Sequence, residues 1–323
     1  MTARAVSELR VLSLSGGVGG AKLARGLSAV VEPGKQHVLV NTGDDFEHLG
    51  LTICPDIDTL LYTLGGVSDT QRGWGRASES WQMLETLGEL GGDTWFQLGD
   101  RDLATHLLRS ARLAAGSDLL QVTDELASAL GIPDRIHPMS ADTVATTVHA
   151  SEGDLPFQHY FVREQCRPEV NGFSFRGIDR ATPNPEVMAM LAARSFDAIV
   201  VCPSNPFVSI DPILRLPGLY QALLDSGVPV TLVSPIVAGL AIKGPAAKMM
   251  SELGMPVTAL GVAQHYHKSY PGLVKYFVLD DSDATLAPEM ARLGMEAVVL
   301  PTVMRTDDDK RALAAGILEL YRD

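Results

Sequence analysis

Short apolar runs alternate along this chain with longer segments of helical period, and this alternation constrains the fold more than any other feature. The runs are rich in β-branched residues and uninterrupted, as expected of strands that are buried on both faces. Alternation of this kind predicts an α/β fold in which a mostly parallel sheet carries helices on both faces. The predicted strands are residues 10–15, 37–41, 197–203, 228–234, 257–262, 275–280 and 296–301.

The middle of the chain has a different pattern. Residues 78–130 are almost entirely helical in period, and two long segments there end in glycines suited to a left-handed cap, Gly116 and Gly131. Residues 145–162 resemble a hairpin and residues 163–184 are rich in loop signals. We therefore expect one enlarged domain over residues 1–323, with its core in about 9–75 and 185–323 and a helical and hairpin insertion in about 76–184.

The charge balance narrows the class of partner. Lys and Arg number 26 against 39 Asp and Glu, so the net charge is −13. Nucleic acids and anionic membranes are bound mainly through Lys and Arg, so we expect neither as a partner and favour small-molecule substrates. The longest charge-free apolar stretch, residues 226–242, is interrupted by prolines and is too short to span a membrane. The chain begins without an apolar export segment, so we expect a cytoplasmic protein.

A glycine-rich turn follows the first predicted strand and opens a helix. Its sequence is SGGVGGAK, with Gly16, Gly17, Gly19 and Gly20 ahead of Lys22. Backbone N–H groups at a helix start favour anions, so the turn predicts a contact with a phosphate or diphosphate. Its spacing matches neither the dinucleotide fingerprint nor the Walker loop, which disfavours ordinary NAD or ATP use. The competing interpretation is a tight turn without a ligand.

Four aspartates lie close together after the second strand, in NTGDD (41–45) and ICPDIDT (53–59). Clustered carboxylates beside hydroxyl and amide groups suit Mg²⁺, and Asp44 and Asp58 are the best candidate ligands. Capping is the alternative, with Asp56 capping a helix at residues 57–64 and Asp45 capping a turn.

A third motif, GDRDLATH, opens another predicted helix. Asp102, His106 and Arg109 share one helical face, which by itself would also fit an ordinary surface stripe. The Gly-Asp-Arg-Asp start favours a functional role for Arg101, as a clamp for carboxylate or phosphate, and for Asp102. The role of His106 stays open between function and surface.

A fourth motif, PSNPFVSI, follows the strongest central strand. Ser204 and Asn205 between two prolines form a rigid polar loop that can contact a base, ribose or phosphate, although an ordinary turn would use the same residues. Lys243 opens a later helix and is a further candidate phosphate contact. His265 and His267 alternate on a predicted helix and point apart, which argues against a metal there.

Absent motifs also constrain the chemistry. The chain has no G-x-S-x-G, no H-E-x-x-H and no paired-cysteine redox motif, and its three cysteines are widely spaced and expected to be reduced. The remaining motifs are a glycine turn that can bind an anion and carboxylates that can bind a cation, and enzymes that transfer phosphoryl groups use both.

The ordered motifs together resemble the 2-phospho-L-lactate transferase family (CofD/FbiA) of coenzyme F420 biosynthesis. The resemblance covers residues 12–304 and implies a Rossmann-like core with a helical insertion. It rests on SGGVGGAK, NTGDD, ICPDIDT, RGWG, LGDRDLATH, PMSAD, FQHYFV, PSNPFVSI, SPIVAGLAIKGPA and VLDDSD.

The resemblance implies a reaction. A phospho-carboxylate group of the 2-phospholactate, phosphoenolpyruvate or 3-phosphoglycerate type would pass from a guanosine-diphosphate-linked donor to the deazaflavin Fo, with Mg²⁺ required and GMP released. A homodimer is also expected.

The resemblance further assigns roles to single residues. The glycine turn would hold the diphosphate, Asp44 and Asp58 the metal, and Asp45 would orient or deprotonate the acceptor. The resemblance assigns Trp74, Asp45 and Asp58 to the binding of Fo. It assigns Ser204, Asn205 and Ser209 to the binding of the nucleotide, and Asp45, Arg101 and Asp102 to catalysis. One departure is Asp211, where the family loop has glycine.

A related group of gluconeogenesis-type regulatory proteins, thought to bind UDP-sugars without catalysis, resembles the same glycine turn. The combined presence of NTGDD, ICPDIDT and GDRD favours the enzyme here. A kinase-like NTPase is disfavoured because Leu23, and not Ser or Thr, follows the turn lysine.

Overall fold

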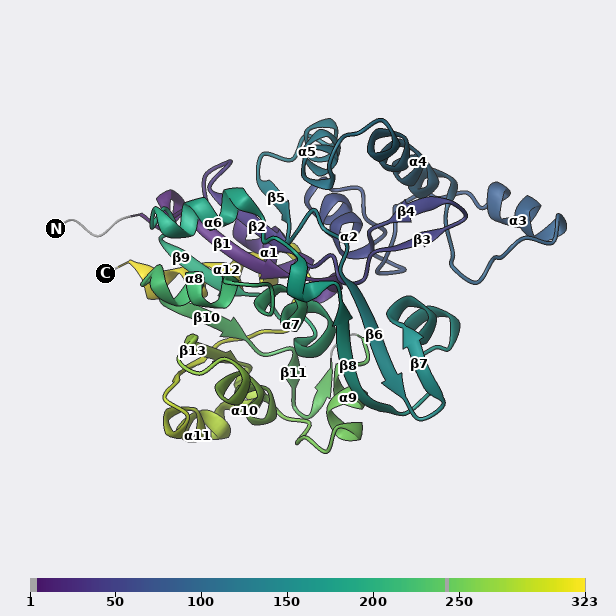
Figure 1. Cartoon of the computed structure of the whole chain (residues 1–323). Helices are drawn as coiled ribbons and strands as arrows, with labels where there is room; N and C mark the ends of the chain where they lie inside the picture. The colour runs from purple at the N-terminus through teal and green to yellow at the C-terminus, as the bar shows by residue number, and fades with distance from the viewer. Residues whose placement is uncertain (1–4, 242–243, 323) are drawn as a thin grey trace.

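The computed structural model describes residues 5–241 and 244–322 and is built around a seven-stranded parallel sheet (Figure 1). The sheet order is β14-β13-β10-β9-β1-β2-β5, so the chain starts in the middle, moves to one edge and then crosses to the other side of β1. This is the doubly wound Rossmann order, and the predicted fold class is confirmed. The strands are β1 (Val11–Ser15), β2 (Gln36–Val40), β5 (Arg135–Pro138), β9 (Ala198–Val201), β10 (Val230–Val233), β13 (Val274–Leu279) and β14 (Glu296–Val299).

Helices cover both faces of the sheet because alternate strand residues point to opposite sides. Val11 of β1 packs in one cluster with Leu23 and Leu313, whereas its neighbour Leu12 packs in another with Leu219. The first face carries α1 (Gly17–Ser28), α2 (Pro55–Leu64), α5 (Leu119–Ala129) and α12 (Asp307–Leu318). The second face carries α6 (Pro185–Ala192), α7 (Asp211–Leu214), α8 (Leu219–Asp225), α9 (Ala246–Glu252), α10 (Ala259–Ser269) and α11 (Ala287–Arg292).

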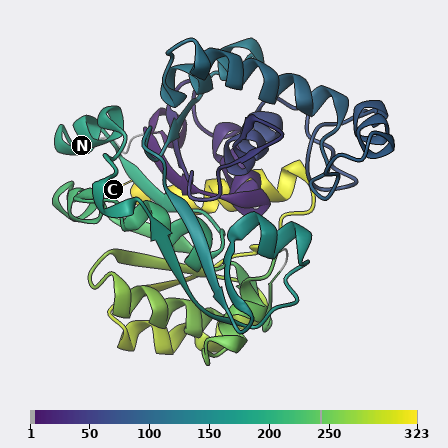
Figure 2. The ribbon, with the colours of Figure 1, turned by 45° about the vertical axis from the view of Figure 1, so that its right-hand side comes forward.

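The insertion projects from one end of the sheet. Helices α3 (Gln82–Glu89) and α4 (Asp100–Ala114) lie beside the hairpin of β3 (Phe46–His48) and β4 (Leu51–Ile53), with α3 at the outer tip (Figure 1). A separate antiparallel sheet, in the order β7-β6-β8, runs down the front of the molecule in Figure 2. Its strands are β6 (Ala145–Ala150), β7 (Gly153–Pro156) and β8 (Val170–Arg176).

The remaining elements are short. They are the 3-10 helices η1 (Val6–Glu8), η3 (Ile178–Arg180), η5 (Asp281–Leu286) and η6 (Glu319–Tyr321), the π-helical turns η2 (His159–Arg163) and η4 (Pro206–Ile210), and the two-residue strands β11 (Ile236–Val237) and β12 (Leu240–Ala241). No helix in the described part of the chain combines the length and apolar character needed to span a membrane.

Three predicted elements differ from the structure. Residues 257–262 are not a strand, because Thr258 caps α10 by accepting a hydrogen bond from the N–H of Gly261 at 3.1 Å. Residues 135–138 lie inside the predicted insertion but form β5, so this part belongs to the core sheet. The predicted hairpin of residues 145–162 is confirmed only in part. Strands β6 and β7 pair, but residues 157–162, expected to belong to its second arm, are helical. Strand β8 adds a third strand in the region expected to be loops.

Candidate functional site

The loops that follow β1, β2 and β9 meet at the point where the strand order reverses. The N–H of Gly16 donates to the Ser204 hydroxyl at 3.1 Å, which joins the first and third of these loops. The Asn41 side-chain amide donates to the carbonyl of Val208 at 3.2 Å, which joins the second and third. Open parallel sheets bind ligands at this position, so the sequence motifs are brought together where the fold expects a site.

The glycines allow α1 to begin in close contact with the loop after β9. A Cβ on Gly16 would lie 2.6 Å from the Cβ of Ser209, and one on Gly19 would overlap the carbonyl of Pro203. Gly20 faces the hydroxyls of Ser15 and Ser204 with no room for a side chain. Close packing therefore requires these glycines whether or not a phosphate binds.

A carboxylate already lies at the start of α1. Gly17, with a φ of 64°, donates its N–H to Oδ1 of Asp56 at 2.6 Å, and the Asn41 amide donates to Oδ2 at 2.9 Å. Burial raises the pKa of Asp56 to about 6, despite these two hydrogen bonds. Asp56 therefore does not cap its own helix α2, whose N-cap is Cys54, but reaches across to α1.

Asp44 and Asp45 place oxygen atoms in the same buried region, where the charge of Arg109 acts on Asp45. Burial is the main cause that raises the pKa of Asp44 well above its ordinary value, and the charge of Asp56 adds to it. Burial also raises the pKa of Asp45, although a hydrogen bond with the Cys54 thiol acts in the opposite direction.

Several buried oxygens in these loops and in the adjoining strands β1 and β6 have no hydrogen-bond partner among the described residues. They are Oδ1 of Asp44, Oδ1 of Asp45 and the hydroxyls of Ser15, Thr42 and Thr146. Buried polar atoms without partners are rare in folded proteins and point to a missing ligand or ion. Carboxylate oxygens are ligands that Mg²⁺ prefers, so Asp44 and Asp45 are candidates to bind this cation.

Asp58, the second predicted metal ligand, is bound by an arginine. Both of its oxygens accept hydrogen bonds from the guanidinium of Arg109, which is 0% exposed. Burial lowers the pKa of Arg109, but the Asp58 charge more than offsets this and holds it above its ordinary value. Asp58 would therefore have to share its oxygens with Arg109 to bind a cation.

The predicted face of α4 is buried and is not a surface stripe. His106 is 1% exposed, and its Nε2 lies 3.3 Å from Oδ1 of Asp102, which also accepts a hydrogen bond from the Tyr62 hydroxyl. Burial raises the pKa of Asp102, but the hydrogen bond with His106 and its charge leave it below the ordinary value. The Arg101 side chain is exposed. The backbone N–H groups of Arg101 and Asp102 both donate to the Glu79 carboxylate.

The Asn205 side chain caps the helical turn in the loop after β9. Oδ1 of Asn205 accepts hydrogen bonds from the N–H groups of Phe207 at 3.0 Å and Val208 at 3.4 Å, which fixes the start of η4. Asp211, at the end of this loop, accepts hydrogen bonds from His265 Nε2 at 3.1 Å and from the Tyr270 hydroxyl at 2.9 Å.

The family model for 2-phospho-L-lactate transferase CofD matches residues 11–306. The chain belongs to the CofD family. It is 39% identical over 320 residues to a phosphoenolpyruvate transferase of Streptomyces griseus, which covers 98% of this chain and 99% of that protein. It is 35% identical over 311 residues to a 2-phospho-L-lactate transferase of Methanosarcina acetivorans, with 96% and 99% covered. The chain is therefore a transferase.

Solved structures support the fold. A UPF0052 family protein from Bacillus halodurans superimposes with a TM-score of 0.64 at 16% identity and covers 96% of this chain and 100% of that one. A second structure of this Bacillus protein gives 0.63 at 18% identity. These likenesses concern the fold alone.

Three other residues predicted for the site, Lys22, Trp74 and Lys243, remain to be placed in this CofD family member. Nζ of Lys22 donates to the carbonyl of Met304 at 3.0 Å. Trp74 is 41% exposed, and the Arg72 guanidinium lies 4.9 Å from its ring centroid and 4.7 Å from that of Trp81. Lys243 lies outside the described residues.

Sequence reasoning missed an aromatic cluster that begins directly after Asp45. Phe46 lies 5.0 Å from Phe96 between ring centroids, and Trp95 lies 5.2 Å from His48 and 5.0 Å from His159. The rings come from three separate segments of the chain, so no local sequence pattern predicts that they pack together.

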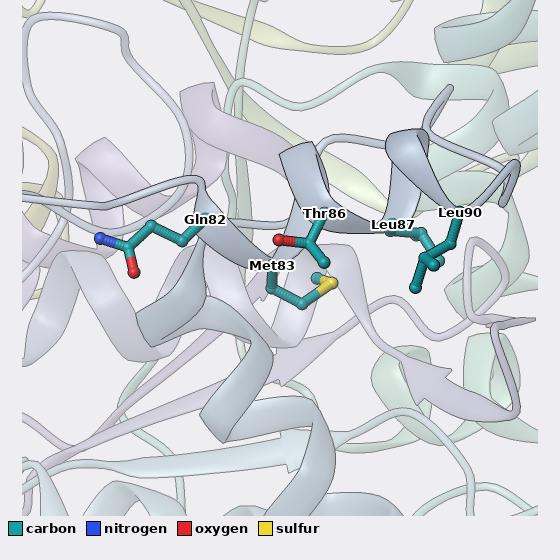
Figure 3. A pocket seen from close by; sticks show the side chains of 5 residues that line it. All are labelled: Gln82, Met83, Thr86, Leu87 and Leu90. Carbon is teal, nitrogen blue, oxygen red and sulfur yellow. The ribbon is translucent and has the colours of Figure 1, made fainter.

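An apolar groove lies on α3, at the tip of the insertion. It has a volume of about 390 Å³ and is lined by Gln82, Met83, Thr86, Leu87 and Leu90 (Figure 3). All five side chains come from α3 and the residue after it, so the groove does not include the acidic loops.

Proposed function

We propose that this chain transfers a phosphoenolpyruvyl group from a guanosine-diphosphate-linked donor to Fo, with release of GMP, in coenzyme F420 biosynthesis. The observation that carries the proposal is that the glycine turn binds Asp56, whose charge acts on the neighbouring buried carboxylates of Asp44 and Asp45. Relatives named phosphoenolpyruvate transferases are 37–40% identical, whereas those named 2-phospho-L-lactate transferases are 34–35% identical. This difference favours the phosphoenolpyruvyl group over the phospholactyl group.

The start of α1 would bind the donor's diphosphate. N–H groups in a first helical turn, here those of Val18 and Gly19, have no acceptor within the helix and attract anions. The Asp56 carboxylate on Gly17 would repel the same anion, so donor binding needs a cation or a proton nearby. The raised pKa of Asp56, about 6, is in keeping with that need.

We propose Asp44 as the first protein ligand of Mg²⁺, with Asp58 as the second ligand that the family resemblance implies. The bound cation would neutralise charge on the diphosphate oxygens and on the GMP that leaves. Ser204, Asn205 and Ser209 are proposed to hold the nucleotide, and Lys22, Lys243 and Arg101 to contact phosphate or carboxylate groups.

A carboxylate of the chain itself would accept the proton that the Fo hydroxyl loses. The Fo hydroxyl oxygen attacks the β-phosphorus of the donor, the bond from that phosphorus to the GMP oxygen breaks, and the hydroxyl proton passes to Asp45. A carboxylate whose pKa is raised by burial accepts a proton more readily than an exposed one. Asp102 and Arg101 are proposed to assist at the start of α4, and Trp74 to contact the deazaflavin ring. No covalent enzyme intermediate is required.

Turnover and binding test this proposal together. Incubation with Fo, Mg²⁺ and the donor should release GMP only when Fo is present, and Fo fluorescence should change saturably. Asp44→Asn should slow GMP release at least about 100-fold. Asp154→Asn, at an exposed hairpin carboxylate, should leave it unchanged. Thermal stabilisation by UDP-sugars without any response to Fo would instead identify a nucleotide-sugar sensor.

The homodimer and the cytoplasmic location remain predictions. Sedimentation equilibrium of the purified chain tests the first, and fractionation of the source cells tests the second.

A further inference from the structure

Two histidines and a glutamate converge at the edge of the sheet, outside the candidate active site. His37 lies on β2, His137 on the neighbouring strand β5, and Glu186 in the first turn of α6. In the strand pairing His37 lies opposite Arg135 and Leu39 opposite His137, so the two rings share one face of the sheet. Each of the three residues offers one ligand atom, and these atoms all lie within 4.8 Å of one another. Among the described residues, no other group of three or more His, Cys, Asp or Glu meets this condition.

The geometry of the group is compact. Nδ1 of His37 lies 2.9 Å from Nε2 of His137, and Nδ1 of His137 lies 3.8 Å from Oε2 of Glu186. The two imidazole planes are within 3° of parallel, and the ring of Phe196 packs edge-on against His37. The rings are therefore held in place by strand pairing and by packing on one side.

Burial prepares the two imidazoles as ligands. His37 is 7% exposed and His137 is 3% exposed, and burial lowers the pKa of each ring to about 4. Burial favours the neutral imidazole, which is the form that binds metals. The Glu186 side chain is exposed and leaves a path for an ion from solvent.

We propose that His37, His137 and Glu186 form a site for a divalent transition metal of the Zn²⁺ class. Two imidazole nitrogens and one carboxylate oxygen, with a water in the fourth position, are a known tetrahedral donor set for Zn²⁺. Mg²⁺ prefers oxygen ligands, so the site is distinct in chemistry from the acidic loops. It is also distinct in position, because His37 lies about 10 Å along β2 from the strand's carboxyl end.

Binding requires two small local changes. With Zn–N bonds of about 2.0 to 2.1 Å, two tetrahedral nitrogen ligands lie about 3.3 Å apart, so the ion replaces the His37–His137 hydrogen bond as the rings separate slightly. Glu186, whose Oε2 lies 3.8 Å from Nδ1 of His137, turns toward the Nε2 side of that ring and exchanges its contact with Arg135 for the ion. Arg135 keeps its contact with Asp124 at 3.0 Å. The positive charge of Arg135 makes the site weaker than a structural zinc site with four protein ligands.

The bound ion would tie the insertion to the core. The chain returns from the helical insertion to the sheet through β5, an edge strand whose only sheet neighbour among the described residues is β2. A ligand set drawn from β2, β5 and α6 joins this edge strand to its neighbour and to the start of α6. Metal binding therefore stabilises this edge of the folded chain.

Titration of the chelator-treated full chain with Co²⁺, followed by its visible absorption, tests the proposal. We expect one equivalent of bound Co²⁺, displacement by Zn²⁺ but not by Mg²⁺, and a rise in Tm with Zn²⁺. His137→Gln should abolish the absorption. Glu186→Gln should weaken binding at least tenfold and retain the fold, because the N–H of residue 186, which donates to the Asn184 cap at 3.1 Å, is unchanged.

His149→Gln is the matched control, because His149 pairs with Asp154 on the exposed hairpin. It should bind Co²⁺ as the wild type does. Absence of Co²⁺ absorption in the folded wild type would overturn the proposal. So would unchanged affinity in both His137→Gln and Glu186→Gln.

Discussion

Replacement of Arg109 by methionine should destabilise the protein strongly, because it leaves a buried carboxylate without its counter-charge. Arg109 is fully buried on α4, and its guanidinium binds both oxygens of Asp58 on α2 and the carbonyl of Thr52 at 3.4 Å. Breaking a buried ion pair by removing one partner costs about 3 to 5 kcal/mol. We expect Arg109→Met to lower the free energy of unfolding by that amount.

The same helix offers a matched control. Arg112 pairs with Glu125 in solvent, where both side chains are more than 40% exposed, so Arg112→Met should change the free energy of unfolding by at most about 1 kcal/mol. In the double variant Arg109→Met/Asp58→Asn the unpaired charge is gone, and part of the loss should be recovered.

Equilibrium unfolding in urea, followed by circular dichroism, measures all four proteins. The midpoints should separate at similar slopes, with Arg109→Met lowest and the double variant between it and the wild type. An Arg109→Met protein within 1 kcal/mol of the wild type would refute the argument that this pair holds the insertion against α2. Equal losses in Arg109→Met and Arg112→Met would refute it as well.

Three further predictions follow from the same structure. Burial lowers the pKa values of His37 and His137 from 6.5 to about 4, so between these pH values the unfolded chain binds more protons than the folded chain. The free energy of unfolding should therefore fall as the pH drops from 6.5 to 4, by up to about 1.4 kcal/mol per pH unit for each ring. Replacing both histidines by Gln should flatten this dependence in urea unfolding measured at each pH. Gly19→Ala should cost about 1 to 3 kcal/mol in thermal or urea unfolding, because its Cβ overlaps a backbone carbonyl, whereas Gly88→Ala on α3 meets only ordinary contacts and should be neutral or stabilising. Asp44→Asn should reduce kcat/KM for GMP release at least 100-fold, about 2.7 kcal/mol, with an unchanged circular dichroism spectrum; retention of wild-type turnover would remove Asp44 from the proposed metal site.

The central sheet could be predicted because its strands are uninterrupted apolar runs. The edge strand β5 could not, since its sequence RIHP carries two polar side chains and ends in proline. The opposite error occurred at residues 257–262, where an apolar run suggested a strand. Thr258 instead caps a helix there, and the apolar side chains of Ala259, Val262 and Ala263 line its buried face.

The sequence predicted that the motif loops meet at one edge of the sheet, as they do, but it could not supply their contacts. The bond between Gly17 and Asp56 joins residues 39 positions apart, and local patterns instead suggested that Asp56 caps its own helix. Helical period grouped His106 with Arg109 but could not say whether their face is buried. That depends on α2 packing against the insertion, which is a tertiary contact.

The central claim is that this chain joins a phospho-carboxylate group to Fo, and mass spectrometry of Fo tests it most directly. Fo would be incubated with the chain, Mg²⁺ and guanosine-diphosphate-linked phosphoenolpyruvate, phospholactate or phosphoglycerate in separate reactions. We predict that Fo gains the mass of the phosphoenolpyruvyl group, with one GMP formed for each product molecule. Unmodified Fo in all three reactions with folded protein would contradict the claim.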